Sequence, residues 1–365
     1  MQKPMTRLFR YLDQYRKSLW FAISSSITNK VFDLMPPFLT AWLIDTVSGN
    51  IPAWIGHWTG LSDAWSVVIF ITFLTLFIFG SESFFEWLFQ REFRRLAQRV
   101  QHDLRLDAYR QLQSRELAYF EEQRTGNLMA MLNDDVNQLE RFLNNIFNEI
   151  IQLITLILVA GWSLMMVSVP LGLLGMTPIP FIIMGSFYYQ KKVAPHYRAV
   201  RESVGQLGNR LENNISGIAV IKSFTAEAYE LERVEQASEK YRDANYNAIR
   251  WTALYNPAIR MLIAFAFAAV LFIGAYWVIN EPSKMTLGGL AFFAMMIQRL
   301  LWPITRLGQV FDDFERARAS ARRVFGLIDA PNTIKNADQV QAVQADRFDI
   351  TLDNVGFYYK KELPI

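Results

Sequence analysis

Residues 150–190 form a run of 41 amino acids without a single charged side chain. About 20 apolar residues in an α-helix cross the hydrocarbon core of a bilayer, so this run is too long for one crossing and long enough for two. Its middle is rich in proline and glycine, at Pro170, Gly172, Gly175, Pro178 and Pro180. Because both residue types interrupt regular structure, we expect two membrane-spanning helices joined by a tight turn.

Four further segments have the length and apolar character of spans. Residues 64–81 and 261–280 contain no charge, residues 18–44 are apolar except for Lys30 and Asp33, and residues 285–301 are apolar up to Gln298 and Arg299. Hydrophobic residues make up 52% of the chain, more than is usual for a soluble domain. The sequence therefore predicts an all-α polytopic membrane protein with six transmembrane helices.

The basic residues predict the orientation of these spans, because cytoplasmic loops carry an excess of lysine and arginine. Residues 47–63 and the turn near Pro170 have none, and Lys284 is alone in the last outer loop. By contrast, residues 91–141 hold nine, residues 191–250 hold ten, and ten more begin at Arg299. We expect a multi-pass protein with both termini in the cytoplasm.

Two long cytoplasmic hairpins are expected, at about residues 91–149 and 191–256. No proline lies between Pro52 and Pro170, so a helix can continue from the second span far into the cytosol. Residues 92–114 and 127–149 are equal in length and would each reach about 35 Å, with a turn near Gly126. Charge alone does not explain two matched stalks, which predict contact with a soluble partner.

Composition excludes several kinds of site. There is no cysteine, and the three histidines are far apart in the sequence, so we predict no metal site. The net charge of +3 does not suggest a nucleic-acid partner. Residues 1–17 place Met5 and Leu8 at helical spacing among five basic residues, which favours an interfacial helix over a solvated tail.

Charges near or within the spans are the candidates for a substrate cavity. Lys30 and Asp33 are spaced i, i+3 on one helix face, either as a local ion pair or as part of a cavity. Pro36 and Pro37 should kink this helix. The remaining candidates are Glu82 and Glu86 near the inner end of the second span, and Arg260 and Arg299 near the inner ends of the fifth and sixth. Snorkelling to the interface is the alternative explanation for these helix-end charges.

Four motifs, in order, resemble those of ATP-binding-cassette (ABC) exporters. Residues 117–136 (LAYFEEQRTGNLMAMLNDDV) and 212–234 (ENNISGIAVIKSFTAEAYELERV) are similar to the two intracellular loops of these proteins. Residues 319–332 (ASARRVFGLIDAPN) resemble the segment that leads to the nucleotide-binding domain, and residues 355–365 (VGFYYKKELPI) resemble its start. The resemblance covers essentially the whole chain.

The resemblance implies a domain-swapped homodimer in the plasma (inner) membrane, or pairing with a homologous half. Short coupling helices at the loop tips would contact nucleotide-binding domains. The first would cover about residues 118–124, including Tyr119, Phe120 and Arg124. The second would cover about residues 223–229, with Phe224 as the anchor beside Thr225, Ala226 and Glu227; the alternative for Phe224 is packing only within its own hairpin.

The resemblance also implies that Tyr359 stacks on the adenine of ATP, with a structural tyrosine as the alternative. No GxxxxGK[ST] phosphate loop occurs in the sequence. We therefore expect ATP and Mg²⁺ to act in the complete protein, and neither to be bound or hydrolysed by this chain alone. Residues 18–330 would be the transmembrane domain, and residues 331–365 a linker and the first strand of a truncated nucleotide-binding domain.

The predicted function is the transmembrane half of an ATP-driven exporter, which moves an amphipathic drug, lipid or peptide by alternating access. A membrane scaffold or receptor without its own ATPase is one alternative. An ion-coupled transporter that uses Lys30, Asp33, Glu82 and Glu86 is another. The matched stalks argue against the ion-coupled transporter, because such a protein needs no soluble motor.

Overall fold

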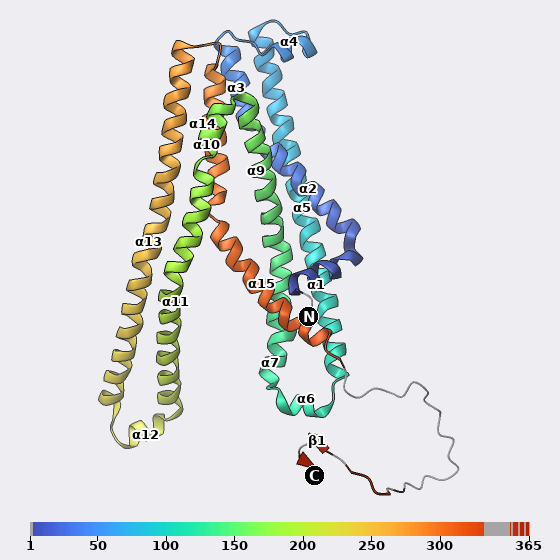
Figure 1. The fold of residues 1–365 in the computed structure, drawn as a ribbon, viewed down its shortest axis with the longest axis vertical. Coiled ribbons are helices and arrows are strands. Elements are labelled where there is room, and N and C mark those ends of the chain that lie inside the picture. The colour runs from blue at the N-terminus through green and yellow to red at the C-terminus, as the bar shows by residue number, and fades with distance from the viewer. Residues whose placement is uncertain (1–2, 332–350, 352, 357, 361–362, 365) are drawn as a thin grey trace. The chain divides into compact units, whose positions relative to one another are not determined.

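The fold is almost entirely helical in the computed structural model, which describes residues 3–331, 351, 353–356, 358–360 and 363–364 (Figure 1). The helices are α1 (Pro4–Tyr11), η1 (Leu12–Tyr15), α2 (Arg16–Asp33), α3 (Pro36–Val47), α4 (Ala53–Thr59), α5 (Ala64–Gln113), α6 (Leu117–Glu122), α7 (Thr125–Ala130), η2 (Met131–Asp135), α8 (Val136–Arg141), η3 (Phe142–Ile146), α9 (Phe147–Val167), α10 (Val169–Met176), α11 (Pro178–Ser216), α12 (Ile218–Ser223), α13 (Glu227–Asn280), α14 (Leu287–Ile304) and α15 (Leu307–Ile328). The chain divides into two compact units.

Five helical stretches among the described residues are long and apolar enough to cross a membrane: Ala64–Gln113, Thr125–Val167, Val169–Ser216, Glu227–Asn280 and Leu287–Ile328. They contain five of the six predicted spans. The predicted first span is divided, since α2 has four charged residues and α3 has only 12 residues. The break lies at Pro36 and Pro37, as expected. The count of six spans stays a prediction.

The charge-free run 150–190 divides near its middle, as its prolines and glycines predicted. Helix α9 ends at Val167, and Ser168 is extended, with φ −160° and ψ 113°. Helices α10 and α11 then follow, each with proline in its first turn. Proline suits these positions because the first turn of a helix leaves its amides unpaired in any case.

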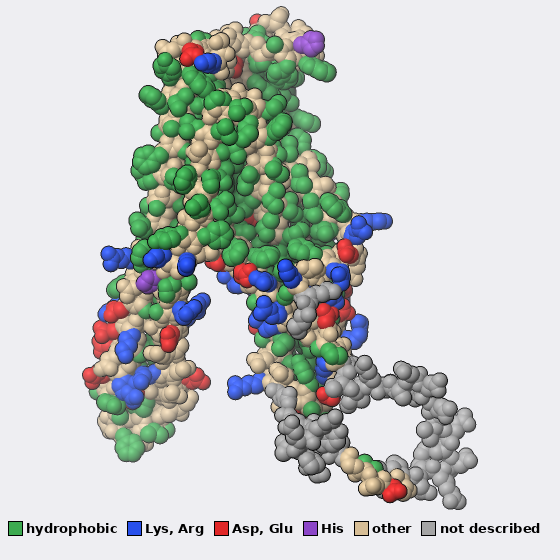
Figure 2. Space-filling view, viewed as in Figure 1, with side chains coloured by type: hydrophobic (Ala, Val, Ile, Leu, Met, Phe, Trp, Pro, Cys, Tyr) green, Lys and Arg blue, Asp and Glu red, His purple; other side chains and the backbone are tan. Residues whose placement is uncertain are grey.

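Helices α11 and α13 form a long hairpin in the second unit, Ile23–Phe89 and Glu149–Asp312, with α12 at its tip (Figure 1). Hydrophobic side chains cover the half of the hairpin that is far from α12, and charged side chains cover the half near α12 (Figure 2). The apolar half of α13 includes the charge-free residues 261–280. The hairpin therefore has one part suited to lipid and another suited to water.

The first unit comprises Met1–Ala22, Gln90–Asn148 and Asp313–Ile365. Its apolar core includes Ala108, Leu112, Leu128 and Leu327, from α5, α7 and α15. Helix α5 runs unbroken from the apolar segment to Gln113, as the absence of proline predicted. The expected turn near Gly126 is wrong in detail: Gly126 lies inside α7, and the chain reverses through α6 and the residues on either side of it.

Two short strands, β1 (Tyr358–Lys360) and β2 (Leu363–Pro364), pair antiparallel near the end of the chain. Ile350, Leu352, Val355 and Phe357 alternate with polar residues in the sequence, a pattern that predicts a strand. Val355 is exposed and belongs to neither strand, while Ile350, Leu352 and Phe357 lie outside the described residues.

The N-terminal helices of the first unit are held to α5 by two tyrosine–aspartate hydrogen bonds. Tyr11 Oη donates to Asp107 Oδ2 at 2.7 Å, and Tyr15 Oη donates to Asp103. Burial raises the pKa of both tyrosines above the usual 10.0, and the hydrogen bond and charge of the neighbouring aspartate raise it further.

Raising the pH above 10 should therefore destabilise the protein. The unfolded chain loses these phenolic protons at a lower pH than the folded chain does, so the free energy of unfolding falls as pH rises through this window. Thermal unfolding between pH 8.5 and 11.5 measures the fall. The control is the double variant Tyr11→Phe/Tyr15→Phe, which should show a shallower fall; equal slopes would contradict the prediction.

Helices α3 and α14 pack closely through Asp45 and Gly288. The Gly288 amide donates to Asp45 Oδ1 at 2.8 Å, and Thr286 Oγ1 donates to Asp45 Oδ2 at 2.9 Å. Thr286 Oγ1 also accepts from the Gly289 amide, which caps α14. A Cβ added at Gly288 would lie 2.2 Å from the carbonyl oxygen of Ala41, so only glycine fits there.

The variant Gly288→Ala should unfold at a lower temperature, because its methyl group forces α3 and α14 apart. Overpacking of this kind typically costs about 1–3 kcal/mol. The matched control is Gly80→Ala, since a Cβ at Gly80 meets no atom within 4 Å. Equal melting temperatures for the two variants, measured in the same detergent, would show that the contact is unimportant.

Candidate functional site

A cluster of three charged side chains lies at the break between α2 and α3. Lys30 Nζ is 2.9 Å from Asp33 Oδ2, and Arg299 Nη1 of α14 is 2.5 Å from Asp33 Oδ1. The side chains are 17%, 27% and 35% exposed for Lys30, Asp33 and Arg299. The local ion pair expected from the sequence is therefore present, and one carboxylate also binds a second cation.

Proline explains why this cluster forms at the break. In a continuous helix the carbonyl of Asp33 would accept from the amide four residues later, but Pro37 has no N–H. Arg299 Nη1 donates to this carbonyl instead. The guanidinium thus satisfies both an unpaired backbone oxygen and a carboxylate, which explains its position within an apolar helix.

Glu82 and Glu86 differ from the other candidates in their contacts. The Glu82 carbonyl accepts a hydrogen bond from Asn29 Nδ2 at 2.9 Å, and its carboxylate interacts electrostatically with Asp33, Lys30 and Arg299. The interaction between Glu82 and Glu86 is repulsive, as expected for two carboxylates at i, i+4. Glu82 therefore lies near the cluster.

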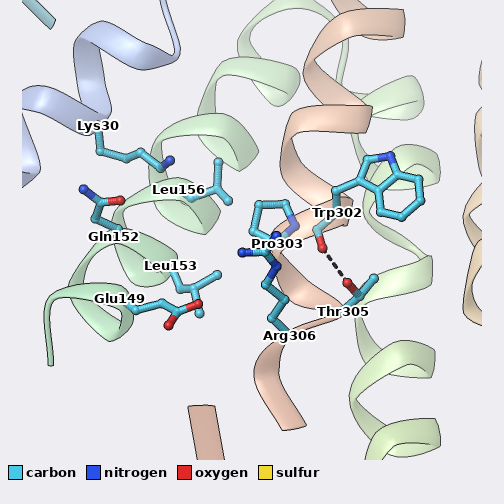
Figure 3. A pocket seen from close by; sticks show the side chains of 9 residues that line it. All are labelled: Lys30, Glu149, Gln152, Leu153, Leu156, Trp302, Pro303, Thr305 and Arg306. Carbon is cyan, nitrogen blue, oxygen red and sulfur yellow. Dashed lines mark hydrogen bonds between the residues drawn. The ribbon is translucent and has the colours of Figure 1, made fainter. Parts of the chain in front are cut away.

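A pocket of about 330 Å³ lies beside the cluster, between α2, α9 and the end of α14. Figure 3 shows Lys30 entering it from one edge, with Glu149 and Arg306 at the opposite edge. Its lining is Lys30, Glu149, Gln152, Leu153, Leu156, Trp302, Pro303, Thr305 and Arg306. A second hollow of about 330 Å³ shares Lys30, Leu156, Trp302 and Pro303 with it and reaches Asp33 and Arg299. The combined space is partly polar and partly apolar, as a site for an amphipathic molecule requires.

Arg260 contacts this region through an aromatic ring. Its guanidinium carbon lies 5.5 Å from the ring centre of Trp302, a cation–π contact between α13 and α14. Arg260 is thus a neighbour of the pocket wall and does not line the pocket itself. Of the six charges predicted for a cavity, Lys30, Asp33 and Arg299 line the two hollows.

The tip of the first hairpin contains the short helix predicted there, as α6 (Leu117–Glu122). Tyr119 packs against the core of the first unit and under the Arg115 guanidinium, 5.5 Å from its ring centre. Phe120 forms a T-shaped pair with Tyr119 and is 38% exposed. Arg124 is exposed and precedes α7. Tyr119 therefore anchors the tip, while Phe120 and Arg124 remain accessible.

The second tip differs from the prediction of a short helix over residues 223–229. The short helix is α12 (Ile218–Ser223), and it ends before Phe224. Thr225 has φ +51°, which no helix continues through, and Glu227 begins α13. Lys222 and Glu227 close the turn with a 2.8 Å ion pair. Phe224 lies at the bend, 80% exposed.

The model of the ABC transporter transmembrane region matches residues 19–304. The chain belongs to this family. It is 27% identical to the uncharacterized ABC transporter ATP-binding protein YknU of Bacillus subtilis, over 98% of this chain and 58% of that protein. It is 26% identical to an ATP-dependent lipid A-core flippase of Syntrophus aciditrophicus, over 72% of this chain and 44% of the flippase.

A multidrug efflux ATP-binding/permease protein of Mycobacterium bovis is 24% identical, over 98% of this chain and 29% of its own length. The chain thus spans less than two thirds of the length of these relatives. As a member of the ABC transporter transmembrane family, it is a multi-pass membrane protein.

Tyr359 is the one residue of this chain predicted to contact ATP. Tyr359 lies in β1, and its side chain is outside the described residues. The sequence has no GxxxxGK[ST] segment to hold phosphates and Mg²⁺. The stacking of Tyr359 on adenine therefore stays a prediction.

Several functional residues were not singled out from the sequence. Asp135 is 8% exposed and binds Arg323 through two hydrogen bonds of 2.5 and 2.7 Å, with a third from Ser320 Oγ at 2.8 Å. These contacts join the first hairpin to α15. Glu149, Gln152 and Arg306 line the pocket. The position of Glu149 immediately beside the charge-free run 150–190 is a signal that could have identified it.

The variant Asp33→Asn should be less stable than Lys30→Gln. Loss of the carboxylate leaves Lys30 and Arg299 both without this partner, whereas Lys30→Gln keeps the Arg299–Asp33 pair. We expect Asp33→Asn to cost about 1–2 kcal/mol, below the value for a fully buried pair because these groups are partly exposed. Thermal unfolding measures both, with the exposed Glu202→Gln as control. Equal losses would contradict a shared carboxylate.

Proposed function

We propose that this chain forms the transmembrane half of an ATP-driven exporter of the plasma (inner) membrane, with both termini cytoplasmic. The complete protein would move an amphipathic drug, lipid or peptide by alternating access. The pocket beside Lys30 carries the proposal, because charged and apolar side chains meet there within otherwise apolar helices. Two relatives, a lipid A-core flippase and a multidrug efflux protein by name, support the same class of substrate.

The hairpin tips support coupling to a soluble motor. Leu117 is 70% exposed on α6, and Ile218 and Val220 are 51% and 61% exposed on α12, at the ends of long charged arms. Exposed apolar side chains at these tips can be buried against a soluble partner protein. Phe224 exposes the largest ring at the second tip, and burial of a phenylalanine in a protein pocket contributes about 1.5–3 kcal/mol.

Alternating access then requires that motion at the tips reaches the pocket. Helix α13 is continuous from Glu227 beside the second tip to Asn280, and it contacts α14 through Arg260 and Trp302. A displacement of the tip would therefore act on the wall of the pocket through a single helix. A second copy of this chain or a homologous half, nucleotide-binding domains, ATP and Mg²⁺ would complete the transporter.

The variant Phe224→Ala tests this function in the complete protein. We expect normal membrane insertion and melting temperature, because the ring is largely exposed. ATP-driven transport of a hydrophobic dye into inverted vesicles should fall about tenfold, since one buried aromatic contact is worth more than the 1.4 kcal/mol that corresponds to tenfold. Dye transport by the unchanged protein must depend on ATP.

The control is Ile249→Ala, which removes an exposed apolar side chain of α13 away from the tip. Normal transport by Phe224→Ala would contradict a coupling role. Dye transport that follows a proton or sodium gradient and ignores ATP would favour the ion-coupled alternative. Absence of dye transport under every driving force would favour the scaffold.

A further inference from the structure

Two charged side chains of the pocket have no part in the Asp33 cluster. Arg306 lies in the two-residue break between α14 and α15, and Glu149 lies in the first turn of α9. Neither forms an ion pair with any residue that the structure describes. Both side chains point toward the interior of the pocket in Figure 3. The pocket thus offers one accessible cation and one accessible anion.

The apolar part of the pocket lies to one side of these charges along the helices. Leu153 and Leu156 are about one and two turns beyond Glu149 in α9, and Trp302 is one turn before Arg306. Both directions lead into the apolar segments that span the membrane. The side chains that α9 and the end of α14 contribute therefore change from charged to apolar over about 10 Å along these helices, and Lys30 enters beside Leu156 (Figure 3).

Lys30 is a second cation that lines the pocket. Its ammonium has three N–H donors, and Asp33 accepts one of them at 2.9 Å. Lys30 lies at the opposite edge of the pocket from Arg306, with the long Arg306 side chain extending toward Pro303 between them (Figure 3). An anionic group in the middle of the pocket would be within reach of both.

We propose that this pocket binds an amphiphile with a zwitterionic head group. The anionic group would lie between Arg306 and Lys30, the ammonium group against Glu149, and the hydrocarbon chain along Leu153, Leu156 and Trp302. A purely anionic head group would face the Glu149 carboxylate, and a purely cationic one would face Arg306 and Lys30. This inference rests on the proposed function, whose substrate class it names.

The size of the site fits this class. The pocket of about 330 Å³ is at the lower limit of small-molecule sites, and the adjoining hollow of about 330 Å³ continues past Leu156 and Trp302. The first can hold a head group, and the apolar side chains of the second, Leu156, Trp302 and Pro303, can contact the beginning of a chain. The Asp33 carboxylate is already bound by two cations, so it leaves Glu149 as the anion available to an ammonium group.

Binding of three dodecyl compounds to the complete protein tests the proposal. Dodecylphosphocholine is zwitterionic, dodecyl phosphate is anionic and dodecyltrimethylammonium is cationic, and all three have the same chain. Titration calorimetry in dodecyl maltoside, which is uncharged, measures the dissociation constants. We expect dodecylphosphocholine to bind about tenfold more tightly than the other two, since each of them lacks one charge-assisted contact.

The variants Arg306→Gln and Glu149→Gln should each weaken dodecylphosphocholine binding about tenfold. Glu149→Gln should also strengthen dodecyl phosphate binding, because it removes the repelling carboxylate. The matched controls are Arg201→Gln and Glu202→Gln, which change exposed charges of α11. Arg306→Lys and Glu149→Asp keep each charge and should retain selectivity, so they separate loss of the site from loss of the fold.

Equal affinity for the three compounds would overturn the proposal, and so would unchanged selectivity in both glutamine variants. ATP-driven transport of the dye distinguishes this result from failure of the proposed function. Dye transport without head-group selectivity would overturn the zwitterion site alone. Selective binding without ATP-driven dye transport would support the site and overturn the exporter.

Discussion

A peptide group that leaves a helix inside a bilayer loses its hydrogen bond and finds no water to replace it. This constraint explains why so much of the chain is helix and where the helices can stop. At the break between α2 and α3, the Leu34 amide still donates to the carbonyl of Lys30, and the Met35 amide to that of Phe32. The break therefore leaves few backbone groups unpaired, and a charged side chain from another helix supplies the missing donor.

The ionic cluster follows from the same constraint. Pro37 removes one amide, the Asp33 carbonyl loses its partner, and the Arg299 guanidinium occupies that position while it also binds the carboxylate. A charge in hydrocarbon costs at least about 2.5 kcal/mol, so Arg299 is tolerated because two oxygens compensate it. Lys30 shares the same carboxylate, and the pocket opens beside this group. The kink and the polar site are thus one feature of the structure.

Much of this arrangement could be predicted from local patterns. Charge-free runs located the apolar helices, and the prolines and glycines located the turn at Ser168 and the kink at Pro36. Spacing along one helix also predicted the Lys30–Asp33 pair. The Arg299 contact could not be predicted, because it joins residues 266 positions apart. The roles of Arg306 and Asp135 could not be predicted for the same reason. The short helix was predicted at residues 223–229, but α12 ends at Ser223. Thr225 adopts a left-handed conformation, which is uncommon for threonine and which the sequence does not predict.

The two arms of the first hairpin differ in helical geometry. Helix α5 is regular throughout, whereas the returning arm contains two π-helical turns, η2 and η3. Each π-turn accommodates one residue more than an α-helical turn, which rotates everything beyond it by about 100° around the helix axis. Asp135 is the last residue of η2 and faces Arg323. A chain shortened by one residue in η2 would regain a regular helix and turn this carboxylate away from its partner. The extra residue in η2 therefore sets the rotation of the returning arm at which Asp135 faces α15.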